Sequence, residues 1–119
     1  MSDMKQKTYY EIVESNLTKK REIILGKAIE LTTGDREDHH GKVFENMESL
    51  SKIWSLRLGV DIKPHQAALM LADLKLMRIW NGKTDFVDHF VDGAGYMAIA
   101  GEVAMFEKEL SDGIAENHD

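Results

Sequence analysis

The stretch DFVDHFVDGAGYMAIAGE (residues 85–102) decides the fold expected of this chain, because it mixes small and apolar residues over about five helical turns. One stripe of the predicted helix runs from Asp88 and Asp92 through Gly95 and Ile99 toward Leu110. This stripe otherwise has the composition of a buried face, where an unpaired carboxylate is costly. The two aspartates therefore need either a structural partner or a ligand.

Composition predicts a single globular domain. The chain has 119 residues, of which 43% are hydrophobic and 30% charged, and it has no cysteine, which excludes disulfides and thiolate metal sites. We expect one all-α domain over residues 1–119, with frayed tails at 1–7 and 111–119. The formal net charge of −6 argues against nucleic acid as a partner. Neither a membrane-spanning apolar run nor a signal peptide is present, so we expect a cytoplasmic protein without a membrane partner.

Helical spacing and end signals predict four helices and no strands. The predicted helices run from Tyr9 or Leu17 to Thr32, over residues 42–58, from Pro64 to Asn81, and from a cap at Thr84 or Asp85 to about Leu110. Gly59 stands at the favoured position after a helix, and proline is favoured in a first turn. A charged connector, residues 35–41, joins the first two helices.

The last two predicted helices are too apolar for a monomeric bundle. The segments ALMLADLKLMRIW (residues 68–80) and GAGYMAIAGEVAMF (residues 93–106) carry apolar residues on nearly every side. A helix on the surface of a bundle needs one polar face. We therefore expect both helices to be central and to meet another copy in a homodimer or a dimer of dimers.

Two pairs of acids are candidates for metal binding. Asp88 and Asp92 are one helical turn apart, and Glu45 and Glu48 are three residues apart on an earlier helix. The helix dipole would explain an acid in the first turn but not Asp92, two turns in, and the glutamates would also suit a solvated face. Helical bundles build metal sites from carboxylates on facing helices, and Mg²⁺ prefers oxygen ligands. Both interpretations stay open at this point.

The remaining polar candidates are mostly cationic. Lys75 and Arg78 are three residues apart in an apolar setting, so they are either ion-pair partners of the acids or phosphate ligands. Arg36 in the connector is a further phosphate candidate or a plain surface residue. Asn46 could position a nucleobase or a water molecule, or satisfy nearby backbone. Tyr96 could reach the site with its hydroxyl or pack in the core.

The order of motifs resembles a known family. DRxxxxG, ENM, KxxR and DxxxDxxGY follow one another across about residues 20–105. This order is similar to a phage-associated family of small helical proteins related to the MazG-like, all-α nucleoside triphosphate pyrophosphohydrolases. Those enzymes hold Mg²⁺ with an ExxE on one helix and an ExxD on the next long helix. Glu45 and Glu48 match the first element, whereas Asp88 and Asp92 depart from the second in spacing and in the first acid.

The resemblance implies a four-helix, MazG-like bundle and a hydrolase that acts in the cytoplasm, in the host if the protein is phage-encoded. It implies Mg²⁺, with Mn²⁺ as a substitute, held by the catalytic residues Glu45, Glu48, Asp88 and Asp92. Substrate binding would fall to Lys75, Arg78, Arg36, Asn46 and Tyr96. A metal-bound water would attack the α-phosphorus of a nucleoside triphosphate and release pyrophosphate.

Two alternatives remain. The first is a non-catalytic, acidic helical phage protein that binds a host or phage partner, and the second is an architectural oligomer without a ligand. The first predicts that Asp88 and Asp92 pair with Lys75 and Arg78 in a closed core. The enzyme hypothesis predicts an open, acid-lined cleft between the helices at 42–58 and 84–110.

Overall fold

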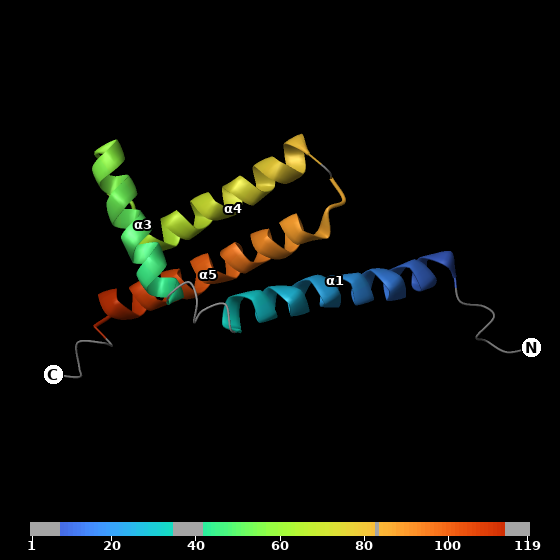
Figure 1. Ribbon diagram of the computed structural model, residues 1–119. Coiled ribbons are helices and arrows are strands. Elements are labelled where there is room, and N and C mark those ends of the chain that lie inside the picture. The colour runs from blue at the N-terminus through green and yellow to red at the C-terminus, as the bar shows by residue number, and fades with distance from the viewer. Residues whose placement is uncertain (1–7, 35–41, 83, 114–119) are drawn as a thin grey trace, which may run out of the picture.

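The computed structural model describes residues 8–34, 42–82 and 84–113. Within these ranges the chain forms four α-helices and no strand: α1 (Tyr9–Thr33), α3 (Val43–Leu58), α4 (Pro64–Asn81) and α5 (Val87–Ser111). The predicted all-α class is therefore confirmed (Figure 1). Of the tails expected at 1–7 and 111–119, residues 1–7 and 114–119 lie outside the described residues, and Ser111 still belongs to α5.

Local capping chemistry explains three of the helix ends. The hydroxyl of Thr8 accepts a hydrogen bond of 3.1 Å from the backbone N–H of Glu11, so α1 begins at Tyr9, the earlier of the two predicted starts. Gly59 ends α3 with a φ of 70°, a left-handed conformation that favours glycine. Pro64 opens α4 as predicted, because a first-turn residue has no N–H partner to lose.

The start of α5 differs from the prediction. Neither Thr84 nor Asp85 caps the helix: both lie in a turn, and Phe86 occupies the N-cap position without a side-chain hydrogen bond. Apolar Phe86 cannot satisfy a free N–H, but its ring lies 4.8 Å, between centroids, from the ring of His89 in an edge-on contact. Ring packing within this turn accompanies the start of α5 in place of a polar cap.

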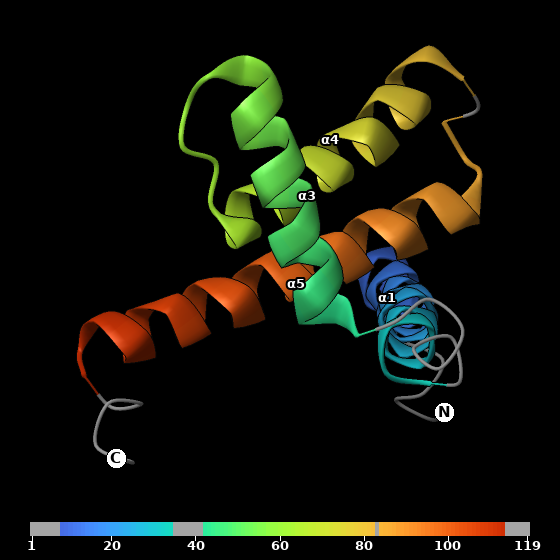
Figure 2. The same cartoon turned by 60° about the vertical axis from the view of Figure 1, so that its left-hand side comes forward.

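Three helices form one layer, with α5 in the middle. Helix α4 runs beside one flank of α5 (Figure 1), and α1 packs against the other flank at an angle, so that it is seen nearly end-on in Figure 2. Helix α3 crosses one side of this layer, over α4 and the second half of α5 (Figure 2). Helix α4 consequently lies at the edge of the layer within a single chain, whereas α5 is central as predicted.

The core lies where α3 crosses the layer. Its buried residues are Met47 from α3, Ala68 from α4, and Ile99, Ala100 and Val103 from α5. The alanines let the three helices approach closely, and larger side chains from each helix close the edges of the cluster. The rings of Phe44 and Phe106 add an edge-on contact between α3 and α5, with centroids 5.4 Å apart.

The arrangement is open. The radius of gyration of the chain is 19.4 Å, whereas a compact domain of this length has about 13.5 Å. The first half of α1 extends past the start of α5 (Figure 1), and Tyr9, Tyr10 and Ile12 at its end are exposed. None of the described helices combines the length and the apolar composition needed to cross a membrane.

Candidate functional site

An ion pair joins α4 to α5 next to the core. The ammonium nitrogen of Lys75 lies 3.2 Å from a carboxylate oxygen of Asp92, and the two side chains are 16% and 29% exposed. Gly93 lies beside this contact, since a Cβ there would meet the Cβ of Lys75 at 3.8 Å, an ordinary van der Waals distance. The pairing of Asp92 with Lys75 is one part of what the non-catalytic alternative predicts; the part that involves Asp88 and Arg78 is not found among the described residues. The pairing also explains how an acid is tolerated on an otherwise apolar stripe.

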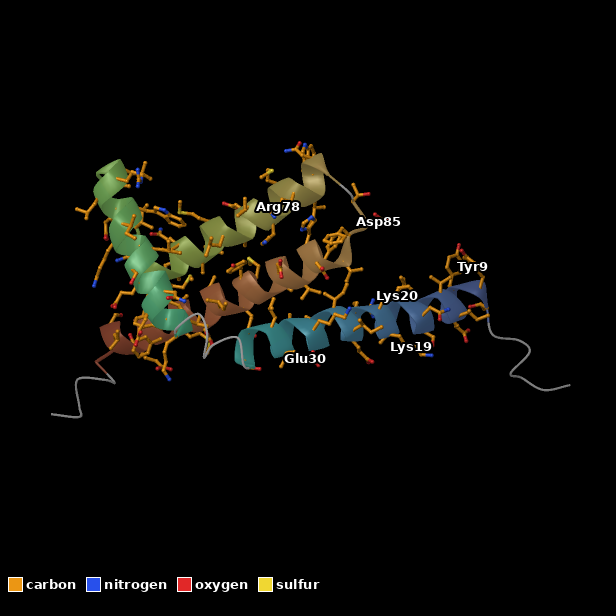
Figure 3. The ribbon with its side chains drawn as sticks, viewed as in Figure 1. Tyr9, Lys19, Lys20, Glu30, Arg78 and Asp85 are labelled. Carbon is orange, nitrogen blue, oxygen red and sulfur yellow. The ribbon has the colours of Figure 1, made fainter. Side chains whose placement is uncertain are left out.

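Two further charges share this side of the α4–α5 pair. Leu71 packs against the core cluster, on the flank of α4 that faces α3. Arg78 comes two helical turns after Leu71 and therefore lies on the same flank, nearer the end of α4. Asp88 lies one turn before Asp92 on α5. Arg78 and Asp88 are both exposed and form no ion pair with another described residue. Figure 3 shows Arg78 near the end of α4 that leads to Asp85.

The glutamates of α3 lie elsewhere. Glu48 forms a long ion pair of 4.0 Å with Lys52 on the surface of α3, and Glu45 is exposed. Glu48 stands one turn after Phe44, whose ring packs on Phe106. Met47, the neighbour of Glu48, packs in the core cluster with Ile99, which comes 7 residues after Asp92 and 11 after Asp88, about 11 and 17 Å along α5. The two acidic pairs therefore lie at different points along α5.

Among the described residues, no group of three or more histidines and acids could hold a metal ion. Asp88 and Asp92 remain as two carboxylates on one surface. Mg²⁺ in nucleotide sites is usually held by one or two carboxylates together with substrate phosphates. That pair fits an ion arriving with a triphosphate, and the four-carboxylate centre stays a prediction.

The hollow between α3 and α5 is apolar. It measures about 390 Å³ and is lined by Phe44, Glu102, Val103 and Phe106. Glu102 is its one acid, and none of the predicted catalytic residues lines it. The acid-lined cleft expected between these two helices is therefore not the hollow found here.

The other predicted substrate residues have separate surroundings. Tyr96 is half-buried and packs against the core cluster, one turn after Asp92. Asn46 is exposed on α3. Arg36 lies outside the described residues. Within the described part of the chain, Lys75, Arg78, Asp88 and Asp92 thus share one surface, with Tyr96 at its inner edge.

A second charged contact was not predicted. A carboxylate oxygen of Glu107 lies 2.7 Å from Nδ1 of His65, and its other oxygen accepts the backbone N–H of His65 at 3.2 Å. Glu107 thereby satisfies a free N–H in the first turn of α4 and ties this end of the helix to α5. The two residues are 42 positions apart, so no local spacing in the sequence could have indicated the pair.

Comparison with known proteins places the chain in a family without assigning an activity. No curated protein and no solved structure matches it significantly. A family model described as a domain of unknown function, DUF6378, matches residues 23–104. The match covers more than half of the chain and includes every predicted site residue, from Arg36 to Tyr96. The protein therefore belongs to the DUF6378 family.

Proposed function

We propose that the protein binds the phosphate groups of a nucleoside triphosphate on the surface of Lys75 and Arg78, as a pyrophosphohydrolase-like protein. The observation that carries this proposal is the set of unused cationic donors there. A lysine ammonium has three donors, and Lys75 has a single ion-pair partner among the described residues. Arg78, one turn further along α4, offers a bidentate fork without an ion-pair partner in that part of the chain.

The ion pair with Asp92 fixes the position of the Lys75 ammonium before an anion binds. Asp92 restrains the ammonium of Lys75 at 3.2 Å and offsets part of its charge. Because the Lys75 side chain is only 16% exposed, a phosphate oxygen reaching its ammonium would meet a charge that water screens weakly. A Mg²⁺ ion carried by the triphosphate and held by Asp88 and Asp92 would supply charge neutralisation and an activated water. Release of pyrophosphate is the reaction that the MazG-like resemblance implies.

The test is a panel of canonical and modified nucleoside triphosphates with Mg²⁺ or Mn²⁺, assayed for bound nucleotide and for released pyrophosphate. Lys75→Met and Asp92→Asn should lose both signals. Lys52→Met and Asp73→Asn are matched controls on exposed surfaces and should keep them. Asp92→Asn should also remove any metal-induced stabilisation, which for the wild type would be about 2.7 kcal/mol at a hundred times the dissociation constant.

A non-catalytic binding protein is the second candidate. Lys75 and Asp92 already contact each other as an ion pair, and the hollow between α3 and α5 is apolar. This candidate expects no nucleotide binding, no pyrophosphate and no thermal response to either metal. It also expects Asp92→Asn to melt early, since Lys75 would then be left without its partner. These outcomes together would remove the enzyme proposal.

A further inference from the structure

The side of the α4–α5–α1 layer opposite α3 is uncovered and apolar. On α5, Phe90, Met97 and Met105 recur at spacings of seven and eight residues, which places them on one stripe. Ile99 and Val103, which meet α3, lie on the other side of the same helix. Between Phe90 and Met105 this stripe is completed by small residues and carries no charge.

The flanking helices extend this stripe into a surface. On α4, Leu69 and Leu76 each come one residue after an inward position, Ala68 and Lys75, and so lie on the flank away from α3. On α1, Ile24 and Ala28 lie on the stripe that faces α5. Leu25 and Ile29 each come one residue later and so lie on the flank away from α3. We call the following set the open face: Leu25, Ile29, Leu69, Leu76, Trp80, Phe90, Met97 and Met105, all of them exposed.

We propose that the open face binds a second copy of this chain, with α5 against α5 across a twofold axis. The size of the exposed surface supports a stable dimer. The chain exposes 9278 Å², whereas a compact protein of this mass exposes about 6,500 Å². Part of the excess, about 2,800 Å², lies on the open face, whose eight large apolar side chains are 38–84% exposed. Each subunit of an obligate homodimer buries roughly 1,000–2,500 Å².

Charge favours a copy of the same chain at this face. The protein carries a net charge of −6, so most of its surface repels a second copy. The centre of the open face has no charge, and charges of both signs come only toward its margin, with Glu22 on α1, Asp73 on α4 and Lys108 on α5. An uncharged centre can pack against the same surface of a second copy without burying an unpaired ion.

Gly101 marks where the two α5 helices would cross. It lies one turn after Met97 and one turn before Met105, in the interior of α5, where glycine costs about 1 kcal/mol of helix stability relative to alanine. A Cβ at Gly101 would meet no described residue of its own chain within 4 Å. The described part of the chain therefore does not require glycine there, whereas close approach of a second helix backbone does.

Light scattering and sedimentation on the full chain test this proposal. We expect a dimer, or a tetramer built from it, at micromolar concentration. Met97→Glu should raise the dissociation constant on the order of a hundredfold, because twofold symmetry places the charge in the interface twice. Leu56→Glu is the matched control, since Leu56 is exposed on α3, away from the open face. Circular dichroism should show both variants still helical.

Cross-linking locates the interface, because the natural chain has no cysteine. Gly101→Cys should form a disulfide-linked dimer under mild oxidation, since a disulfide needs Cα atoms within about 7 Å. Leu56→Cys should not. A wild-type monomer would overturn the proposal and leave the face to a different partner. An oligomer that resists Met97→Glu, or that Leu56→Glu dissociates equally, would also overturn it. Failure here leaves nucleotide binding at Lys75 untouched, so the two proposals fail separately.

Discussion

Ile99 and Met97 are two residues apart on α5 and similar in size and polarity, yet one is 8% exposed and the other 55%. Ile99 faces α3, and Met97 faces the open side of the same layer. Burial here depends on which helix crosses which side, and apolar character alone does not reveal it. The covered side also holds the charged contact of Lys75 with Asp92, whereas the open side has an uncharged centre.

The largest expected difference between the two sides is in core stability. Ile99→Ala should lower the free energy of unfolding by about 2–5 kcal/mol, because it leaves a cavity beneath α3. Met97→Ala should change the unfolding of isolated subunits by less than about 0.5 kcal/mol. Denaturant titrations over a range of protein concentrations measure both, and Met97→Ala should act only where subunits associate. Equal losses at all concentrations would contradict the assignment of the two sides.

The ion pair on the covered side should have a smaller effect. Lys75→Met keeps the aliphatic stem but leaves Asp92 without its cation, and we expect a loss of about 1–3 kcal/mol, below that of a fully buried pair, since Asp92 is 29% exposed. Chemical denaturation in low and high salt measures it. An unchanged midpoint would show that the pair contributes nothing to folding. Lys52→Met serves as the exposed control.

The contact of Glu107 with His65 should contribute about 1 kcal/mol. Glu107→Ala removes the acceptor of a free N–H at the start of α4 as well as the ring contact. Glu109→Ala, two residues on and exposed, should have no measurable effect. Thermal melts of the two variants provide the comparison, and equal melting temperatures would contradict a capping role.

The smallest expected effect compares two glycines of α5. A Cβ at Gly95 would lie 3.1 Å from the methyl group of Thr32 on α1, whereas a Cβ at Gly101 would meet open space. In the Met97→Glu background, where subunits are separated, Gly101→Ala should therefore be more stable than Gly95→Ala, by less than about 1 kcal/mol. In the wild-type background, Gly101→Ala should weaken association. The reverse order in the separated subunits would show that Gly101 has an unseen neighbour within the chain.

Much of the fold was predictable because helix ends depend on nearby residues. Gly59 and Pro64 mark the ends of α3 and α4 through backbone conformation alone, and Asn81 closes α4 as expected. The start of α5 was predicted one to two residues early, because Phe86 packs on His89 where a polar cap was expected. The candidate site was less predictable: the sequence offered both a metal centre and an ion pair for Asp92, and spacing could not separate them.

By itself, the sequence determined the all-α class, the approximate limits of the four helices and the excess of apolar surface on the last two, since all three follow from local backbone preference and helical periodicity. Only the tertiary structure decided that Asp92 meets Lys75, that Phe44 packs on Phe106, and that Glu107 reaches His65. These contacts depend on how α3 crosses the layer and how α4 folds back on α5. A helical pattern gives the direction of a side chain around its own axis, but not the helix that it faces.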